Sequence, residues 1–135
     1  MYLSETSVRV RYAETDRMNY VYYGNYASYF EVARVEALRD LGMTYRRMEE
    51  EGFLLPVLEY KVKYFKPAFY DELLHIKTCI PFMPSVKIVF RYEIFNETGM
   101  KLNDAETTLV FLSKESGRPC KAPSELLQKL SPYFS

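Results

Sequence analysis

The residue of this chain best placed for chemistry is the Asp16 carboxylate, in the polar turn Glu14-Thr15-Asp16. The segment before the turn alternates like a strand and the segment after it reads as a helix, so we expect Asp16 just ahead of a helix N-terminus. The first N–H groups of a helix lack intrahelical partners and can stabilise the negative oxygen that forms when a carbonyl is attacked. The turn therefore favours acyl chemistry, and a simple helix cap is the alternative for Asp16.

Other reactive residue types are sparse. His75 is the single histidine and lies in an alternating segment, where a packed strand residue is more usual than a catalytic base. Cys79 and Cys120 lie far apart with no metal-ligand spacing and no histidine close in sequence, so we expect free thiols and no cysteine nucleophile. We expect no catalytic metal and no cofactor.

Composition and charge exclude several classes of partner. Lysine plus arginine and aspartate plus glutamate number 18 each, so no net positive field attracts nucleic acid. No uninterrupted apolar stretch approaches the ~20 residues that span a bilayer, and the first residues do not resemble a signal peptide. We therefore expect a cytoplasmic protein that binds no nucleic acid and does not insert into membranes.

The elements that position the turn follow from hydrophobic periodicity. Alternation over Glu5–Tyr12 predicts a half-buried strand with Val8, Val10 and Tyr12 on one face. After the turn, an apolar stripe at spacings of three and four predicts a helix of about five turns that ends near Gly42. The residues of this stripe are Tyr26, Tyr29, Phe30, Ala33, Ala37 and Leu41.

Two details of the helical part of the chain can be interpreted. Glu31 and Arg34 lie three residues apart on the flank of the long helix, and we interpret them as a surface or subunit-contact ion pair. Met43–Glu51 predicts a second, shorter helix closed by Gly52. We expect it to be marginal alone, because its arginines begin it and its glutamates end it, against the helix dipole.

The remainder of the chain is predicted to be mainly strand. Strands are expected over Leu54–Phe65, Glu72–Phe82, Val86–Phe95 and Met100–Ser113, with a terminal helix after Pro123. The Gly-containing turn at 96–99 joins two alternating runs, which indicates a hairpin and a mainly antiparallel sheet. The pattern predicts an α+β fold in one domain, residues 1–135, with a sheet of about five strands and one long central helix.

The stretch from Arg11 to Arg34 resembles the opening motif of the hot-dog-fold acyl-CoA thioesterases, in particular the 4-hydroxybenzoyl-CoA thioesterase-like branch and the Tol–Pal-associated thioesterases. The matching residues are Glu14-Thr15-Asp16, Tyr22-Tyr23, Asn25-Tyr26 and Tyr29 to Arg34. Many relatives carry histidine where this chain has Tyr23, but the hydroxybenzoyl branch has tyrosine there. Asn19 stands where the family usually has glycine, and Asn is the next most tolerant residue if the position needs a left-handed backbone.

This resemblance implies a fold, an assembly and a mechanism. It implies a hot-dog fold, an antiparallel sheet wrapped around one long helix, with active sites between subunits and therefore a homodimer or homotetramer. It implies hydrolysis of an acyl-CoA thioester with Asp16 as the catalytic carboxylate, acting as nucleophile or as general base. It further implies the backbone N–H of Tyr23 as an oxyanion donor. Tyr12 matches a tyrosine close to the carboxylate in some relatives, and a core tyrosine is the alternative.

Substrate-binding residues are also suggested. The chain has 13 tyrosines and 9 phenylalanines, which could line a groove for an acyl or aryl group or form a dimer interface. Within the matching stretch the candidates are Tyr22, Asn25 and Tyr26. The resemblance implies scattered basic residues for coenzyme A, with solvated surface charges as the alternative. The candidates for this role are Lys61, Lys63, Lys87, Arg118 and Lys121.

Other functions stay open. An acyl-carrier-protein thioesterase would act on the same acyl group, attached to a different carrier. A non-catalytic acyl-CoA-binding dimer would keep the fold without turnover. A hydroxyacyl dehydratase of the same fold is disfavoured, because His75 lies outside the helix region where that activity places its histidine. The acyl group is not specified by the sequence.

Overall fold

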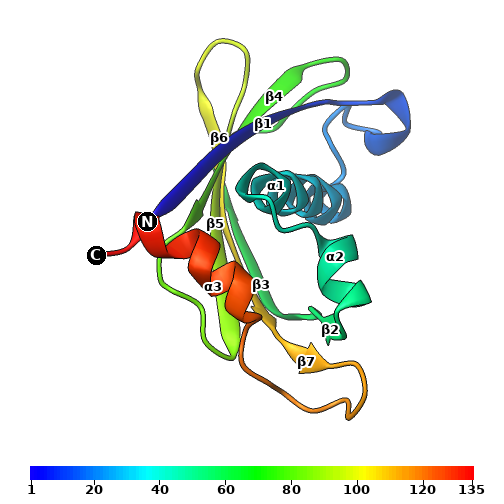
Figure 1. Ribbon diagram of the computed structural model, residues 1–135. Coiled ribbons are helices and arrows are strands. Elements are labelled where there is room, and N and C mark those ends of the chain that lie inside the picture. Colours follow the sequence, from blue (N-terminus) through cyan, green and yellow to red (C-terminus); the bar gives the residue numbers. More distant parts are fainter.

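A curved antiparallel sheet wraps around one long helix in the computed structural model, which describes residues 1–135 (Figure 1). The five strands of this sheet, in spatial order, are β1 (Tyr2–Arg9), β4 (Leu73–Ile80), β5 (Lys87–Phe95), β6 (Lys101–Val110) and β3 (Val57–Tyr64). All of its pairings are antiparallel. The predicted α+β architecture is confirmed.

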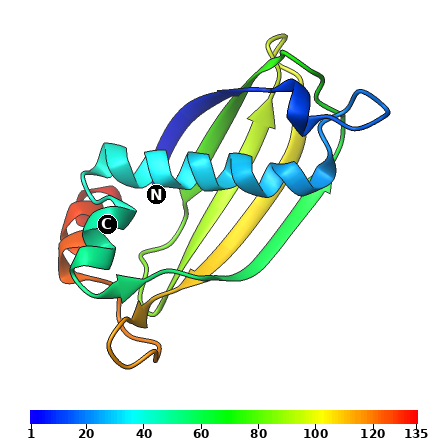
Figure 2. The same ribbon diagram turned by 90° about the vertical axis from the view of Figure 1, so that its right-hand side faces the viewer.

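The smaller elements lie at one end of the sheet. They are the two-stranded sheet of β2 (Phe53–Leu54) and β7 (Leu112–Ser113), and the short helices α2 (Tyr45–Glu50) and α3 (Ser124–Leu130). Figure 2 shows these elements near one end of the long helix α1 (Tyr26–Leu41), with the loop that precedes α1 at its other end. No helix of the chain has the length and the apolar character that crossing a membrane requires.

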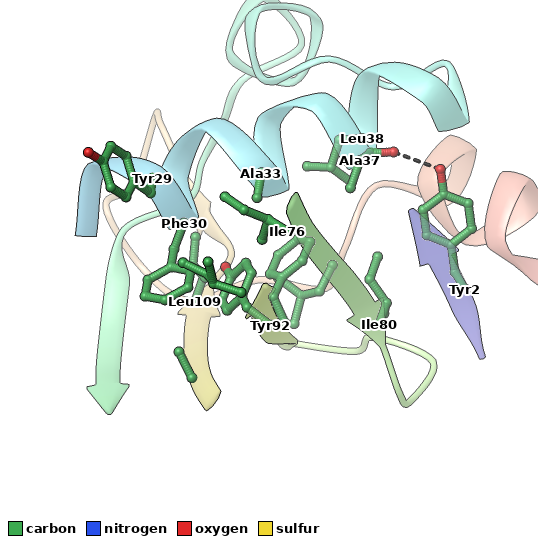
Figure 3. Close-up of a cluster of buried hydrophobic side chains, with 14 of the residues drawn as sticks. Tyr2, Tyr29, Phe30, Ala33, Ala37, Leu38, Ile76, Ile80, Tyr92 and Leu109 are labelled. Carbon is green, nitrogen blue, oxygen red and sulfur yellow. Dashed lines mark hydrogen bonds between the residues drawn. The ribbon is translucent and has the colours of Figure 1, made fainter. Parts of the chain in front are cut away.

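Helix α1 packs its predicted stripe onto the sheet (Figure 3). Phe30 and Ala37 are fully buried, and they meet the inward residues of β4, which alternate as predicted and include Ile76 and Ile80. Burying a side chain of the size of Phe or Ile stabilises the fold by about 1.5–3 kcal/mol. The buried apolar side chains form one cluster, which therefore holds α1 and the sheet together.

Local contacts define the C-terminal end of α1 and the start of α2. Gly42 adopts a left-handed φ of 90° and its N–H bonds back to the last turn, so the helix ends where predicted. Thr44 then caps α2 by accepting a hydrogen bond from the Arg47 N–H at 3.2 Å. Near the C-terminal end of α1, the Tyr2 hydroxyl donates to the Ala37 carbonyl at 2.8 Å and ties β1 to the helix (Figure 3).

The first strand differs from its prediction. It begins at Tyr2 and ends at Arg9, and the chain leaves the sheet through Val10, whose backbone bonds Asp71 and Glu72 instead of continuing the ladder. Tyr12 lies in a 3₁₀ turn and is 77% exposed. Its predicted place on the inward face of the strand, and the alternative of a core tyrosine, are therefore wrong.

Two other expectations are corrected by the structure. The strand predicted over Leu54–Phe65 is divided around Pro56 into β2 and β3, because proline has no N–H for a continuous ladder. No ion pair joins Glu31 and Arg34 within the chain. Arg34 is buried instead, and its Nε donates to the Tyr45 hydroxyl at 3.0 Å.

Candidate active site

The segment between β1 and α1 forms a tight, doubly anchored loop. Asp16 N–H donates to the Tyr20 carbonyl at 2.8 Å, and Thr15 and Val21 form an antiparallel bridge. The Val21 N–H donates to the Ala68 carbonyl at 2.8 Å, which fastens the loop to the segment before β4. Asn19 has a φ of 65°, so this position does adopt a left-handed backbone, which Asn tolerates better than most residues.

The Asp16 carboxylate is held at one oxygen. Its Oδ1 accepts hydrogen bonds from the Met18 N–H at 2.8 Å and the Tyr20 N–H at 3.3 Å, while Oδ2 has no hydrogen-bond partner within the chain. The side chain thus closes a turn on its own backbone, as aspartate does in loops, and does not cap a helix. The expectation that Asp16 sits directly at a helix start is wrong, because residues 17–25 separate it from α1.

The start of the helical segment carries free donors. A 3₁₀ turn, Tyr23–Asn25, runs directly into α1, so the helical segment begins at Tyr23. Neither the Tyr23 N–H nor the Gly24 N–H has a hydrogen-bond partner within the chain. They are the unpaired donors of a helix start, and they can donate hydrogen bonds to a negatively charged oxygen.

A hollow of about 630 Å³ lies beside Asp16. Its lining includes Tyr12, Arg17, Phe69 and Tyr70, and the rings of Tyr12 and Tyr70 meet edge to face with centroids 5.6 Å apart. Sequence reasoning missed Phe69 and Tyr70, which come from the segment before β4. The one available signal was an aromatic pair directly after Pro67-Ala68, in a stretch without alternation.

The predicted acyl-side residues lie around the start of the helical segment. Tyr22 and Tyr23 are exposed, with ring centroids 4.8 Å apart. Tyr26 is buried against Tyr64 of β3, and burial raises its pKa to about 12. Asn25 makes a structural contact, because its side-chain amide donates to the Glu14 carbonyl at 2.8 Å.

The predicted basic residues are not gathered beside Asp16 within one chain. Lys61 and Lys63 lie on the outer face of β3, away from α1, where Lys61 pairs with Glu106 at 3.7 Å. This face also has a hollow of about 780 Å³, but half of its lining residues are charged and Asp16 is not among them.

The other basic candidates occupy the far end of the sheet. Lys87, Arg118 and Lys121 are all exposed. Their segments are brought together by two hydrogen bonds, from the Phe111 N–H to the Val86 carbonyl and from the Cys120 N–H to the Phe111 carbonyl, each at 2.9 Å. In Figure 2 this end, with the loop after β7, lies opposite the loop that precedes α1. Within one chain, therefore, these side chains do not reach the Asp16 carboxylate.

The possible metal ligands and the two cysteines do not form an organised site. No group of three or more His, Cys, Asp or Glu side chains is arranged to hold a metal ion. Cys79 and Cys120 are both free, as expected. The Cys79 thiol has a raised pKa, mainly because of burial, which makes it a weaker nucleophile at neutral pH.

The chain is similar in sequence to one family model and to individual proteins of known sequence. Residues 10–130 match the family model of the thioesterase-like superfamily. YneP of Bacillus subtilis (strain 168) is 38% identical over 119 residues, which cover 88% of this chain and 86% of that protein. YbgC of Escherichia coli O157:H7, an acyl-CoA thioester hydrolase, is 32% identical over 120 residues, covering 89% and 90%.

A solved structure is similar over nearly the whole chain. The DHNA-CoA thioesterase of Staphylococcus aureus superposes with a TM-score of 0.93 at 35% identity, covering 98% of this chain and 91% of that one. The hot-dog fold implied by the motif around Asp16 is confirmed.

Proposed function

The chain belongs to the thioesterase-like superfamily and is a thioester hydrolase, and we propose that residues 1–135 form one domain that hydrolyses an acyl-CoA to the free acid and coenzyme A. One observation carries the proposal: the half-buried Asp16 has one oxygen held by backbone N–H groups and the other free. Unpaired N–H groups at Tyr23 and Gly24 follow in the same short segment. A fixed carboxylate and unpaired donors are what acyl transfer requires.

The reaction uses each group in a defined way. Either Asp16 Oδ2 attacks the thioester carbonyl carbon and the resulting anhydride is hydrolysed, or Oδ2 takes a proton from the water that attacks. In both cases the carbonyl oxygen becomes negative and accepts hydrogen bonds from the Tyr23 and Gly24 N–H groups. The C–S bond then breaks and the sulfur of coenzyme A leaves as the thiolate or takes a proton.

The acyl group lies in the aromatic hollow in this proposal. Tyr12, Phe69 and Tyr70 offer ring faces and edges beside Asp16. Such a lining suits an aryl or other flat apolar acyl group. The similar S. aureus protein is named for an aryl-CoA ester, which agrees with this preference.

We propose a homodimer as the smallest assembly, formed across β3. This edge strand pairs only with β6, and Leu58, Tyr60 and Tyr64 are exposed on it. The two tyrosines lie on its face toward α1. Its free edge leaves backbone groups that a second copy can pair. An antiparallel two-fold pairing would bring the far end of the partner's sheet toward the Tyr64 end of β3 and the Asp16 loop. That far end includes the start of β5 and the segment after β7, where the basic candidates lie.

That arrangement accounts for the predicted coenzyme A contacts. Lys87, Arg118 and Lys121 of one copy would face the active-site loop of the other and meet the phosphates of the substrate. A tetramer of two such dimers is compatible with this pairing. We place the protein in the cytoplasm, where its two unpaired cysteines stay reduced.

Steady-state hydrolysis of short, medium and long fatty acyl-CoAs and of aryl-CoAs tests the proposal, with release of free thiol as the signal. Asp16→Asn should lose ~100-fold or more in kcat. Asp40→Asn is the matched control, because Asp40 is an exposed residue near the C-terminal end of α1. Equal rates for wild type and Asp16→Asn would remove Asp16 from the mechanism.

Absence of turnover on every CoA ester would refute the acyl-CoA proposal. Acyl-carrier-protein esters would then be assayed with the same variants. If those are not hydrolysed either, binding of acyl-CoA without turnover would identify the chain as a binding module.

A further inference from the structure

Glu14 lies two residues before Asp16, and its carboxylate is directed away from the hollow, toward α1. We propose that the Glu14 carboxylate, held by Tyr29 of α1, is a positioning group that sets Asp16 in place relative to the donors at Tyr23 and Gly24. This inference rests on the proposed thioesterase function. It gives a role to a side chain that makes no contact in the hollow.

Four donated hydrogen bonds occupy the carboxylate. Its Oε1 accepts from the Tyr29 hydroxyl and from the Arg11 N–H, both at 2.8 Å. Its Oε2 accepts from the Arg11 guanidinium at 3.2 and 3.3 Å. The Glu14 side chain is 14% exposed, whereas that of Arg11 is 77% exposed, so the contact with the helix is the shielded one.

The backbone of Glu14 holds the segment that carries the unpaired N–H groups. Its carbonyl accepts from the Tyr22 N–H and from the Asn25 side-chain amide, each at 2.8 Å. Tyr22 directly precedes the free N–H of Tyr23, and Asn25 ends the same 3₁₀ turn. One residue therefore connects the loop of Asp16, the start of the helical segment and the body of α1.

The helix provides a rigid reference for this connection. Tyr29 is 3% exposed and packs edge to face on Tyr26, with ring centroids 5.8 Å apart. The Asp16 side chain is held only by neighbours in its own loop. Without the Glu14 contacts, the loop would be fastened to the body of the protein only where Tyr20 and Val21 meet the segment before β4, so its Asp16 end could move. A misplacement of about 1 Å at a reacting group can cost ~100-fold in rate, so loss of the Tyr29 contact should be visible in kcat.

Glu14 does not itself serve as base or nucleophile in this scheme. Burial acts to raise its pKa, but the hydrogen bonds from Arg11 and Tyr29 outweigh burial and lower it. The carboxylate is thus ionised at neutral pH, and both of its oxygens are engaged. A group in that state orients a loop and does not take a proton.

Tyr29→Phe tests the inference, because it removes the hydroxyl and leaves the buried ring. Tyr2→Phe is the matched control: it removes a buried hydroxyl from the opposite end of α1, where it donates to Ala37 at 2.8 Å. We expect Tyr29→Phe to lower kcat ~10-fold with KM changed less than about twofold, and Tyr2→Phe to leave both within about twofold. In an Asp16→Asn background, Tyr29→Phe should cause no further loss, since it acts through Asp16.

A second measurement does not depend on catalysis. Amide hydrogen exchange of Asp16, Met18 and Tyr20 reports the closure of the loop, and we expect it to be ~10-fold faster in Tyr29→Phe than in wild type or Tyr2→Phe. If loop exchange and kcat are the same in Tyr29→Phe and Tyr2→Phe, the positioning role is wrong, whether or not Asp16 is catalytic. If no thioester is hydrolysed but the exchange changes as expected, the proposed function fails and the role of Glu14 in placing the loop stands.

Discussion

Removing a single backbone N–H at the start of the helical segment is the most direct test of the oxyanion donors. Tyr23→Pro does this, because proline has no N–H, and the first position of a helix is where proline is best tolerated. The residue before it, Tyr22, has φ −62° and ψ 131°, an extended conformation that a following proline favours. The substitution is therefore compatible with the local backbone.

The expected magnitudes separate folding from catalysis. The Tyr23 N–H has no partner within the chain, so its removal breaks no hydrogen bond of the folded protein. We expect the free energy of unfolding to change by less than about 1 kcal/mol. An oxyanion donor is worth about 3–4 kcal/mol in the transition state, which corresponds to a loss of ~100-fold to ~1000-fold in kcat.

Tyr23→Ala is the control for the assay. It also removes the exposed Tyr23 ring but keeps the N–H, so the ratio of kcat between the two variants isolates the donor. The assay is steady-state release of free thiol from the best CoA ester, with urea unfolding of each variant measured in parallel. A kcat of Tyr23→Pro within about threefold of Tyr23→Ala, at equal stability, would refute the assignment of this N–H.

Two further predictions concern stability and assembly. Because the pKa of Glu14 is lowered in the folded chain, its contribution to stability is full above the unfolded pKa of about 4.3 and is lost as the pH falls through the lower folded value. In urea unfolding, the difference in the free energy of unfolding between wild type and Glu14→Gln should therefore be constant near neutral pH and disappear below about pH 4. A difference that increases in acid would contradict this prediction. Leu58→Lys, at an exposed residue of the edge strand β3, should convert a dimer to a monomer in sedimentation velocity. Leu3→Lys, on the opposite edge strand β1, should not. A monomeric wild type, or equal masses for the two variants, would refute dimerisation through β3.

Local patterns were sufficient for most of the fold. The stripe from Tyr26 to Ala37 predicted α1, because residues at spacings of three and four share one face of a helix. The left-handed backbone at Gly42 and Asn19 follows from the few residues that tolerate it. Alternation predicted the strands, but Tyr12, beyond the last paired residue of β1, was assigned to the wrong environment.

The site itself was only partly determined by the sequence. The motif identified Asp16 and Tyr23 as candidates, because they lie in one short segment whose residue types match those of the family. Tyr70 enters the hollow from a distant segment, and Tyr29 reaches Glu14 across 15 residues. Such contacts depend on how α1 lies on the sheet and on which strands pair, and no local periodicity contains that information.

The sequence by itself therefore determined most of the elements, the family and the candidate carboxylate, since these depend on residue type and short spacing. Only the tertiary structure decided that Arg34 is buried beside Tyr45 and that the basic residues lie at the far end of the sheet. The physical reason is that hydrogen bonding and burial are settled between segments distant in the chain, when the curved sheet closes around α1.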